Sequence, residues 1–172
     1  MNWEYYDKYI NKKTKGRCDV TPIFRDPEVF SNLIKDFNKM FKKDSYDIIV
    51  GLDALGFIIA SAMSQKQKKG LVVIRKGGKL PGIKGTIIRT SFTDYTNTKK
   101  TFEMNKSAIK KGEKVLIVDE WIETGTQAKA AIKLVEKQGG KVIGIATMAA
   151  HNNKKTKILF EKYNCKTIRQ IK

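Results

Sequence analysis

The sequence predicts an α/β fold with a mainly parallel sheet and helices on both of its faces. Two observations lead to this prediction. Short, continuous apolar runs, such as those in 46–52 (YDIIVGL) and 114–120 (KVLIVDE), are typical of buried parallel strands. They alternate with longer segments whose apolar residues recur at helical spacing. Because strand–helix–strand units form right-handed crossovers, this alternation favours one mainly parallel sheet covered on both sides.

The first helix is predicted for residues 27–43, where apolar residues recur every three or four positions. Asp26 followed by Pro27 is a typical helix start. The later elements are expected in this order: strand 46–52, helix 54–67, strand 70–76, two extended segments at 85–95 and 99–104 joined by a polar loop, strand 114–120, helix 126–138 stopped by Gly139 and Gly140, strand 141–150, helix 155–164 and strand 166–171.

Length and composition indicate one domain. The 172 residues suffice for a core that folds alone, and 41% hydrophobic with 30% charged residues is an ordinary globular composition. We expect a single domain over 1–172, with an N-terminal segment or small hood at 1–25. Trp3, Tyr5, Tyr6 and Tyr9 predict that this segment packs on the body of the protein or on a partner chain.

Charge and rare residues exclude several function classes. The net charge of +18 comes mostly from lysines spread along the whole chain, so we favour a solvated basic surface, then a phosphate-rich ligand, and nucleic acid third. Cys18 and Cys165 lack metal-ligand spacing and indicate free thiols in a reducing cytoplasm. No apolar run is long enough for a membrane span, and the N-terminus does not resemble a secretory signal. With His151 as the single histidine, which we expect at the surface or capping a helix, histidine-based catalysis and metal sites are disfavoured.

Three loops are expected to meet at one edge of the sheet, since ligands in such folds bind beyond the carboxyl ends of the strands. These loops are 51–56 (GLDALG), 75–82 (RKGGKLPG) and 119–127 (DEWIETGTQ). The Thr124-Gly125-Thr126 turn before a helix is suited to a phosphate. Paired acids at a strand end can accept hydrogen bonds from ribose hydroxyls or hold Mg²⁺ through water. Arg75, Lys76 and Lys79 supply cations for a second anionic group. Together they predict a site for a phosphorylated sugar that carries a further phosphate or pyrophosphate.

The stretch 115–127 (VLIVDEWIETGTQ) resembles the phosphoribosyl pyrophosphate motif of type I phosphoribosyltransferases. Segments 48–63 and 72–82 are similar to the adenine phosphoribosyltransferases in particular, and RKGGKLPG is the most specific match. Segment 19–30 (DVTPIFRDPEVF) resembles that family's N-terminal motif, and 76–105 matches its flexible loop region in layout. The likeness runs from about Asp19 to Ala149 and implies the type I phosphoribosyltransferase fold.

The resemblance implies a role for each matching residue. The ribose 5-phosphate would be bound by Asp119, Glu120, Glu123, Thr124, Gly125, Thr126 and Gln127. The pyrophosphate would be bound by Asp53, Ala54, Leu55, Arg75 and Lys79, in a loop where the family often has a non-proline cis peptide. The catalytic residues would be Asp94, matching the flexible-loop acid proposed to transfer a proton, and the acid pair Asp119 and Glu120. The base would lie near Trp121, Arg17 and Cys18.

The implied reaction displaces pyrophosphate from phosphoribosyl pyrophosphate by a purine, with adenine favoured, as in purine salvage. Mg²⁺ would arrive with the substrate and touch Asp119 and Glu120 at most through water. The resemblance also implies a cytoplasmic homodimer.

Four departures from the family pattern leave alternatives open. Leu55 stands where the family has an arginine, and Glu123 places a carboxylate beside a phosphate site. Thr126 replaces a glycine and requires a negative φ, and Arg17 with Cys18 replaces the residues that stack on the base. The alternatives are a ligand-sensing relative with weakened catalysis, a hypoxanthine or guanine phosphoribosyltransferase and, third, a nucleic-acid-associated protein.

Overall fold

The fold is that of a computed structural model, which describes residues 1–14, 18–83, 85–94 and 96–172. Its helices are α1 (Trp3–Asp7), α2 (Thr21–Arg25), α3 (Pro27–Met40), α4 (Leu55–Gln67), α5 (Thr126–Lys137) and α6 (Lys157–Glu161). Its strands are β1 (Ile48–Leu52), β2 (Gly70–Lys76), β3 (Ile87–Thr93), β4 (Lys99–Asn105), β5 (Lys114–Val118), β6 (Trp121–Ile122), β7 (Lys141–His151) and β8 (Cys165–Ile171).

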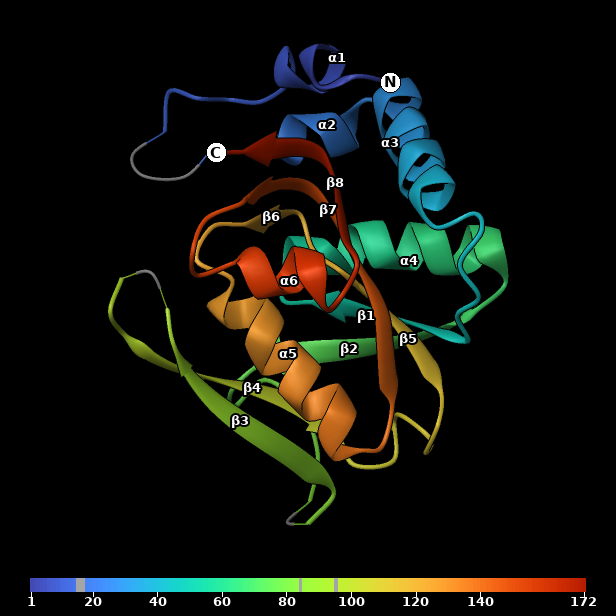
Figure 1. Cartoon of the computed structure of the whole chain (residues 1–172), viewed down its shortest axis with the longest axis vertical. Helices are drawn as coiled ribbons and strands as arrows, with labels where there is room; N and C mark the ends of the chain where they lie inside the picture. Colours follow the sequence, from blue (N-terminus) through green and yellow to red (C-terminus); the bar gives the residue numbers. More distant parts are fainter. Residues whose placement is uncertain (15–17, 84, 95) are drawn as a thin grey trace.

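The strands form one mainly parallel sheet, which confirms the predicted fold class (Figure 1). Their order is β3-β4-β2-β1-β5-β7-β6, and β8 pairs with β7 beside this path. Strands β1, β2, β5, β6, β7 and β8 pair in parallel, whereas β3 and β4 form an antiparallel hairpin joined to β2 through β4. The carboxyl ends of β1, β2, β5 and β7 therefore lie at the same edge of the sheet.

The two faces of the sheet carry separate apolar cores, as the alternation along β5 shows. Leu116 and Val118 pack on one face with residues of α3 and α4, and Val115 and Ile117 pack on the other with residues of α5. All four side chains are fully buried. This two-residue period is what a strand covered on both faces requires. Helices on both faces are thus confirmed.

The predicted ends of the helices are correct where the capping residues are strong. The Asp26 side chain accepts hydrogen bonds from the N–H groups of Glu28 (2.9 Å) and Val29 (3.0 Å), which fixes the start of α3. Gly139 has a φ of +82°, and α5 ends just before it, at Lys137. The predicted helices at 27–43 and 155–164 are too long, since α3 ends at Met40 and α6 spans Lys157–Glu161.

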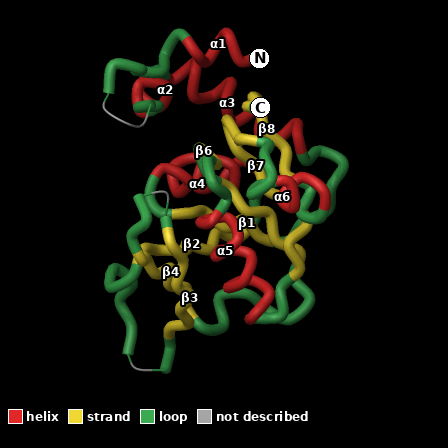
Figure 2. Tube along the Cα trace, turned by 60° about the vertical axis from the view of Figure 1, so that its left-hand side comes forward, coloured by secondary structure: helices red, strands yellow, loops and turns green. Residues whose placement is uncertain are grey.

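The N-terminal segment contains two short helices that the sequence did not predict, α1 and α2. Trp3 and Tyr6 of α1 are buried in the core that also contains α3, so this segment packs on the body of the protein as expected. Figure 2 shows α1 and α2 at one end of the molecule and the β3–β4 hairpin at the other. Among the described residues, no helix has both the length and the apolar character to cross a membrane.

Candidate active site

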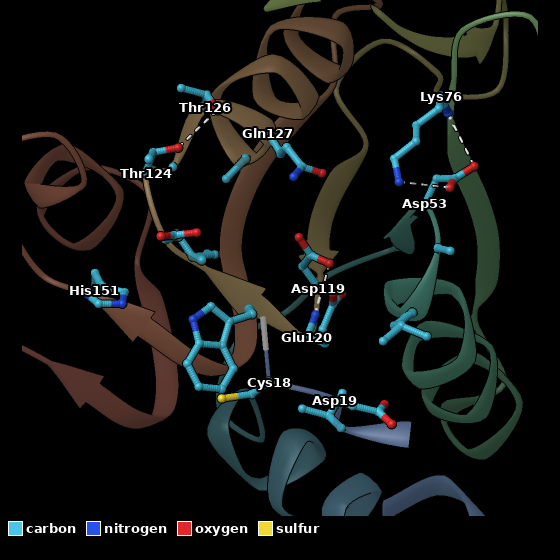
Figure 3. Close-up of a pocket in the computed structure, with 18 residues that line it drawn as sticks. Cys18, Asp19, Asp53, Lys76, Asp119, Glu120, Thr124, Thr126, Gln127 and His151 are labelled. Carbon is cyan, nitrogen blue, oxygen red and sulfur yellow. Dashed lines mark hydrogen bonds and ion pairs between the residues drawn. The ribbon is translucent and has the colours of Figure 1, made fainter. Parts of the chain in front are cut away.

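A pocket of about 330 Å³ lies beyond the carboxyl ends of β1 and β5 (Figure 3). Its walls come from five parts of the chain, as expected for this edge of an α/β sheet. The lining residues are 18–20, 53–55, 119–128, Lys76 and His151. Two of the three loops expected to meet, 51–56 and 119–127, therefore do so, and the loop 75–82 contributes through Lys76 alone.

The acid pair lies directly after β5 and is fixed by backbone contacts. Asp119 and Glu120 are only 6% and 7% exposed. The Asp119 N–H donates to the Ala146 carbonyl (3.1 Å), and the Asp119 carboxylate accepts from the Glu120 N–H (3.0 Å). Gly56 allows α4 to approach this strand end, because a Cβ there would lie 2.8 Å from the Val118 carbonyl oxygen. Two buried carboxylates are thus held at one wall of the pocket, next to the loop of Asp53.

The Thr124-Gly125-Thr126 turn forms the wall at the start of α5. Gly125 has a φ of +72°, and Thr126 is the first residue of the helix and is not among those with positive φ. The negative φ that the sequence required of Thr126 is thus confirmed. The hydroxyl oxygens of Thr124 and Thr126 lie 3.2 Å apart. The start of this 12-residue helix has no side-chain cap among the described residues, so its backbone N–H groups, with two hydroxyls beside them, suit an anion such as phosphate.

The loop after β1 contains the Asp53–Ala54 peptide bond in the cis form, as the resemblance implied. The Asp53 carboxylate is 3.7 Å from both Arg75 Nε and Lys76 Nζ, and it accepts a long hydrogen bond from the Lys76 N–H (3.3 Å). Figure 3 shows the Lys76 side chain beside Asp53 at the edge of the pocket. The buried carboxylate is thus balanced by cations from the end of β2.

Three predicted pyrophosphate residues line the pocket, and two do not. Asp53, Ala54 and Leu55 line it, whereas Arg75 and Lys79 lie outside it. The Arg75 guanidinium instead donates to the Lys79 carbonyl (2.8 Å). Of the three basic residues expected to supply cations, Lys76 is the one that lines the pocket.

Asp94, predicted as a catalytic acid, lies in the turn of the β3–β4 hairpin and does not line the pocket. Its carboxylate accepts hydrogen bonds from the Thr96 N–H (2.9 Å), the Thr96 hydroxyl (2.6 Å) and the Thr98 N–H (3.1 Å). The Thr96 side-chain hydrogen bond above all holds the pKa of Asp94 below its usual range. In this arrangement Asp94 is a turn-capping carboxylate.

Two of the three residues predicted to lie near the base line the pocket. Trp121 is half-buried and lines the pocket, and so does Cys18. The prediction for Arg17 lies outside the described residues. Glu123 also lines the pocket, is exposed and has no ion pair in the part of the chain that the structure describes. Among the described residues, no lysine forms an ion pair with Glu123 that would turn its carboxylate away from the phosphate site.

His151 was predicted to be a surface or capping residue, and its side chain is partly exposed, but its place in the pocket was not predicted. It ends β7 and lines the pocket, on the side of Thr124 (Figure 3). The strand was predicted to end at Ala150, so His151 was not recognised as the residue at the carboxyl end of this strand. The rule that ligands bind beyond the strand ends would have found it, since β7 is a neighbour of β5. Lys76, in contrast, was among the cations expected from the sequence, and it lines the pocket as the last residue of β2.

Comparison with known proteins identifies the class. A family model described as the phosphoribosyl transferase domain matches residues 23–172. The adenine phosphoribosyltransferase of Nitrosopumilus maritimus (strain SCM1) is 38% identical over 165 residues, which cover 94% of each chain. The protein therefore belongs to the phosphoribosyltransferase family.

Solved structures narrow the likeness within that family to adenine phosphoribosyltransferases. The enzyme from Rhodothermus marinus superposes with a TM-score of 0.86 at 30% identity, covering 98% of each chain. The enzyme from Saccharomyces cerevisiae, complexed with adenine and an imino-altritol bisphosphate, gives a TM-score of 0.74 at 30% identity. That match covers 86% of this chain and 88% of the yeast enzyme.

Proposed function

We propose that the protein transfers the phosphoribosyl group of phosphoribosyl pyrophosphate to adenine, giving the nucleoside monophosphate and pyrophosphate. The observation that carries this proposal is the pocket in which a buried acid pair faces a Thr-Gly-Thr turn at a helix start. The similarity to adenine phosphoribosyltransferases supports adenine as the base.

We assign the ribose hydroxyls to Asp119 and Glu120, whose carboxylates can accept hydrogen bonds from adjacent hydroxyl groups. The 5-phosphate is assigned to the turn 124–127, where it would meet N–H groups and the positive end of the α5 dipole. The pyrophosphate is assigned to the loop 53–55 and to Lys76. Arg75 and Lys79 lie nearby, and their side chains would have to move toward the pocket to contact it. The base is assigned to the side of Trp121 and Cys18.

In the reaction the bond from C1 of the ribose to pyrophosphate breaks, and a bond from N9 of adenine to C1 forms. The proton of N9 leaves, and the pyrophosphate carries away the electrons of the broken bond. The chain contributes by holding the two reactants in line and by balancing charge at the leaving group, chiefly through Lys76. For Asp94 to receive the proton, the β3–β4 hairpin would have to move toward the pocket.

Mg²⁺ fits this site as a companion of the substrate. In the part of the chain that the structure describes, no group of three or more acidic, histidine or cysteine side chains is arranged to hold a metal. Mg²⁺ commonly binds through one or two carboxylates together with substrate phosphates and water, which suits Asp119 and Glu120. When bound, it would neutralise charge on the departing pyrophosphate.

The assembly proposed is a homodimer. Ile58 in the first half of helix α4 is 39% exposed. Leu71 at the start of β2 is 38% exposed. Because single exposed aliphatic side chains are common on soluble proteins, the proposal of a homodimer rests mainly on the resemblance to type I phosphoribosyltransferases. We also propose one domain, with a hood at 1–25 and a flexible region at 76–105, and a cytoplasmic location that suits the free thiols of Cys18 and Cys165.

A second candidate is a ligand-sensing relative that binds phosphoribosyl pyrophosphate with little turnover. Leu55 favours it because an aliphatic side chain lines the pocket where the family has an arginine. Glu123 favours it because its carboxylate lies at the proposed phosphate site and has no ion pair among the described residues. A hypoxanthine or guanine phosphoribosyltransferase is a variant of the main proposal, and nucleic-acid binding by the +18 surface ranks below both.

Calorimetric titration with phosphoribosyl pyrophosphate and Mg²⁺, beside a nucleotide-formation assay with adenine, hypoxanthine and guanine, separates these candidates. Binding with nucleotide formed from adenine is the expected result. Binding without turnover of any base supports the sensor. Turnover of hypoxanthine or guanine instead of adenine changes the substrate, and absence of binding refutes the assignment of the pocket.

A further inference from the structure

Three residues on adjacent strands lie in one row across the sheet, next to the pocket. Trp121 of β6 pairs in register with Ala149 of β7, and Ala149 pairs with Arg169 of β8. Residues paired in register on parallel strands project from the same face of the sheet. Ala149 in the middle is small and fully buried, so two long side chains flank a short one.

The indole of Trp3 is in contact with both flanking side chains. Its ring centroid lies 6.1 Å from that of Trp121, at an interplanar angle of 72°, which is an edge-to-face contact. The guanidinium carbon of Arg169 lies 5.1 Å from the Trp3 ring centroid. Trp3 and Ala149 belong to the same buried core cluster, and Trp3 is only 9% exposed. A residue from the start of the chain thus packs beside the row, between Trp121 and Arg169.

Helix α1, which carries Trp3, is tied to α3 by polar contacts. The Tyr6 hydroxyl donates to the Asp36 carboxylate (2.6 Å), and the Asn32 amide donates to the Tyr5 hydroxyl (3.1 Å). The N-terminal amino group also forms an ion pair with Asp36. Because α3 packs on the sheet, these contacts hold the Trp3 indole against Trp121.

We propose that Trp3 is a positioning residue for the purine base and acts through Trp121. This inference rests on the proposed function. Trp121 lines the pocket and Trp3 does not, so Trp3 touches the base site only through the indole of Trp121. Strand β6 has two residues, and its few backbone hydrogen bonds leave the Trp121 side chain dependent on its neighbours. Without the Trp3 ring, the Trp121 indole gains rotamers, and binding a base must order it again.

The first test compares Michaelis constants for the two substrates in the full-length protein. Trp3→Leu is expected to raise KM for adenine by about three- to tenfold, the range that an aromatic pair contributes. KM for phosphoribosyl pyrophosphate and kcat are expected to stay within about twofold of their values in the unaltered protein, since neither depends on the contact between Trp121 and the base. Trp3→Phe keeps a ring in place and is expected to restore most of the affinity for adenine. Tyr163→Leu, an aromatic-to-leucine change outside the pocket lining, is the matched control and should alter neither constant.

A second test does not depend on turnover and uses fluorescence. The chain contains only two tryptophans, Trp3 and Trp121, so Trp3→Phe leaves Trp121 as the single indole. Adenine added in the presence of pyrophosphate and Mg²⁺ should change the emission of this variant at about the same concentration as in the unaltered protein. In Trp3→Leu the Trp121 emission should shift to longer wavelength, and the change should require more adenine. If Trp3→Leu fails to fold, as judged by circular dichroism, Arg169→Leu tests the other side of the Trp3 ring, with a smaller rise in KM for adenine expected.

The inference is overturned if Trp3→Leu leaves KM for adenine unchanged, or raises both Michaelis constants equally as a general loss of structure would. It is also overturned if Tyr163→Leu has the same effect. Failure of the proposed function is seen in the unaltered protein instead, as absence of nucleotide formation and of any purine-dependent change in emission.

Discussion

Gly125→Ala tests whether the turn before α5 requires a residue without a side chain. Gly125 has a φ of +72°, which costs an L-residue about 1–2 kcal/mol. A Cβ there would also lie 3.1 Å from both Leu159 Cδ1 and Thr156 Cγ2, and both of these residues are fully buried. Since neither neighbour has room to move away, we expect a further cost of roughly 1 kcal/mol. The free energy of unfolding should therefore fall by about 2–3 kcal/mol, as measured by urea denaturation.

Gly112→Ala is the matched control for this prediction. Gly112 has a φ of +86°, but a Cβ there would meet nothing within 4 Å. This variant should show only the backbone cost, about 1–2 kcal/mol, and should leave KM for phosphoribosyl pyrophosphate unchanged. Gly125→Ala should also raise that KM, because the N–H groups of the turn would shift. Equal losses of stability in the two variants, or an unchanged KM in Gly125→Ala, would refute the reasoning.

Three further changes address charge in and around the pocket. Leu55→Arg adds a bidentate phosphate donor, which stabilises the complex by about 1.5–3 kcal/mol, so KM for phosphoribosyl pyrophosphate should fall roughly ten- to hundredfold in a steady-state assay. An unchanged KM would contradict the assignment of pyrophosphate to the loop 53–55. Glu123→Gln should lower the same KM by about two- to fivefold at low salt, and the gain should vanish at high salt, because an exposed charge is screened; a gain that persists at high salt would contradict this. The hydrogen bond from Arg89 (2.6 Å) holds the pKa of Glu103 below its usual value of 4.5, so Glu103 stabilises the fold above that value and loses this effect as the pH falls through its lowered pKa. Glu103→Gln should therefore be less stable than the unaltered protein near neutral pH in urea denaturation, and the difference should close in acid; a constant difference at all pH values would refute the ion pair as its cause.

Much of the fold could be predicted because it depends on local signals. The apolar run of β5, the Asp26-Pro27 start of α3 and the Gly139 stop of α5 act within a few residues of chain. The turn 124–126 and the acid pair were predicted for the same reason. Each of these features depends on interactions between residues that are close together in the sequence.

The elements that were missed depend on distant partners. Strand β6 exists because Trp121 and Ile122 pair with the end of β7, and α1 is held by contacts of Tyr6 and Trp3 with residues far along the chain. Such contacts leave no periodic trace in the sequence. The choice of Lys76 over Arg75 at the pocket was equally hidden, because it depends on which way each side chain leaves the end of β2.

The contact between Trp3 and Trp121 has a consequence for folding kinetics. The two residues are about two thirds of the chain apart, and contacts of such long separation form late because a large loop must be closed first. The helices and β1, β2, β5 and β7 can form through shorter-range contacts, whereas the hood docks only when both ends of this loop are in place. In refolding, the circular dichroism signal should therefore recover before tryptophan emission. The wall beside the proposed purine site would be among the last parts of the molecule to assemble, and the emission of the two tryptophans would report when it does.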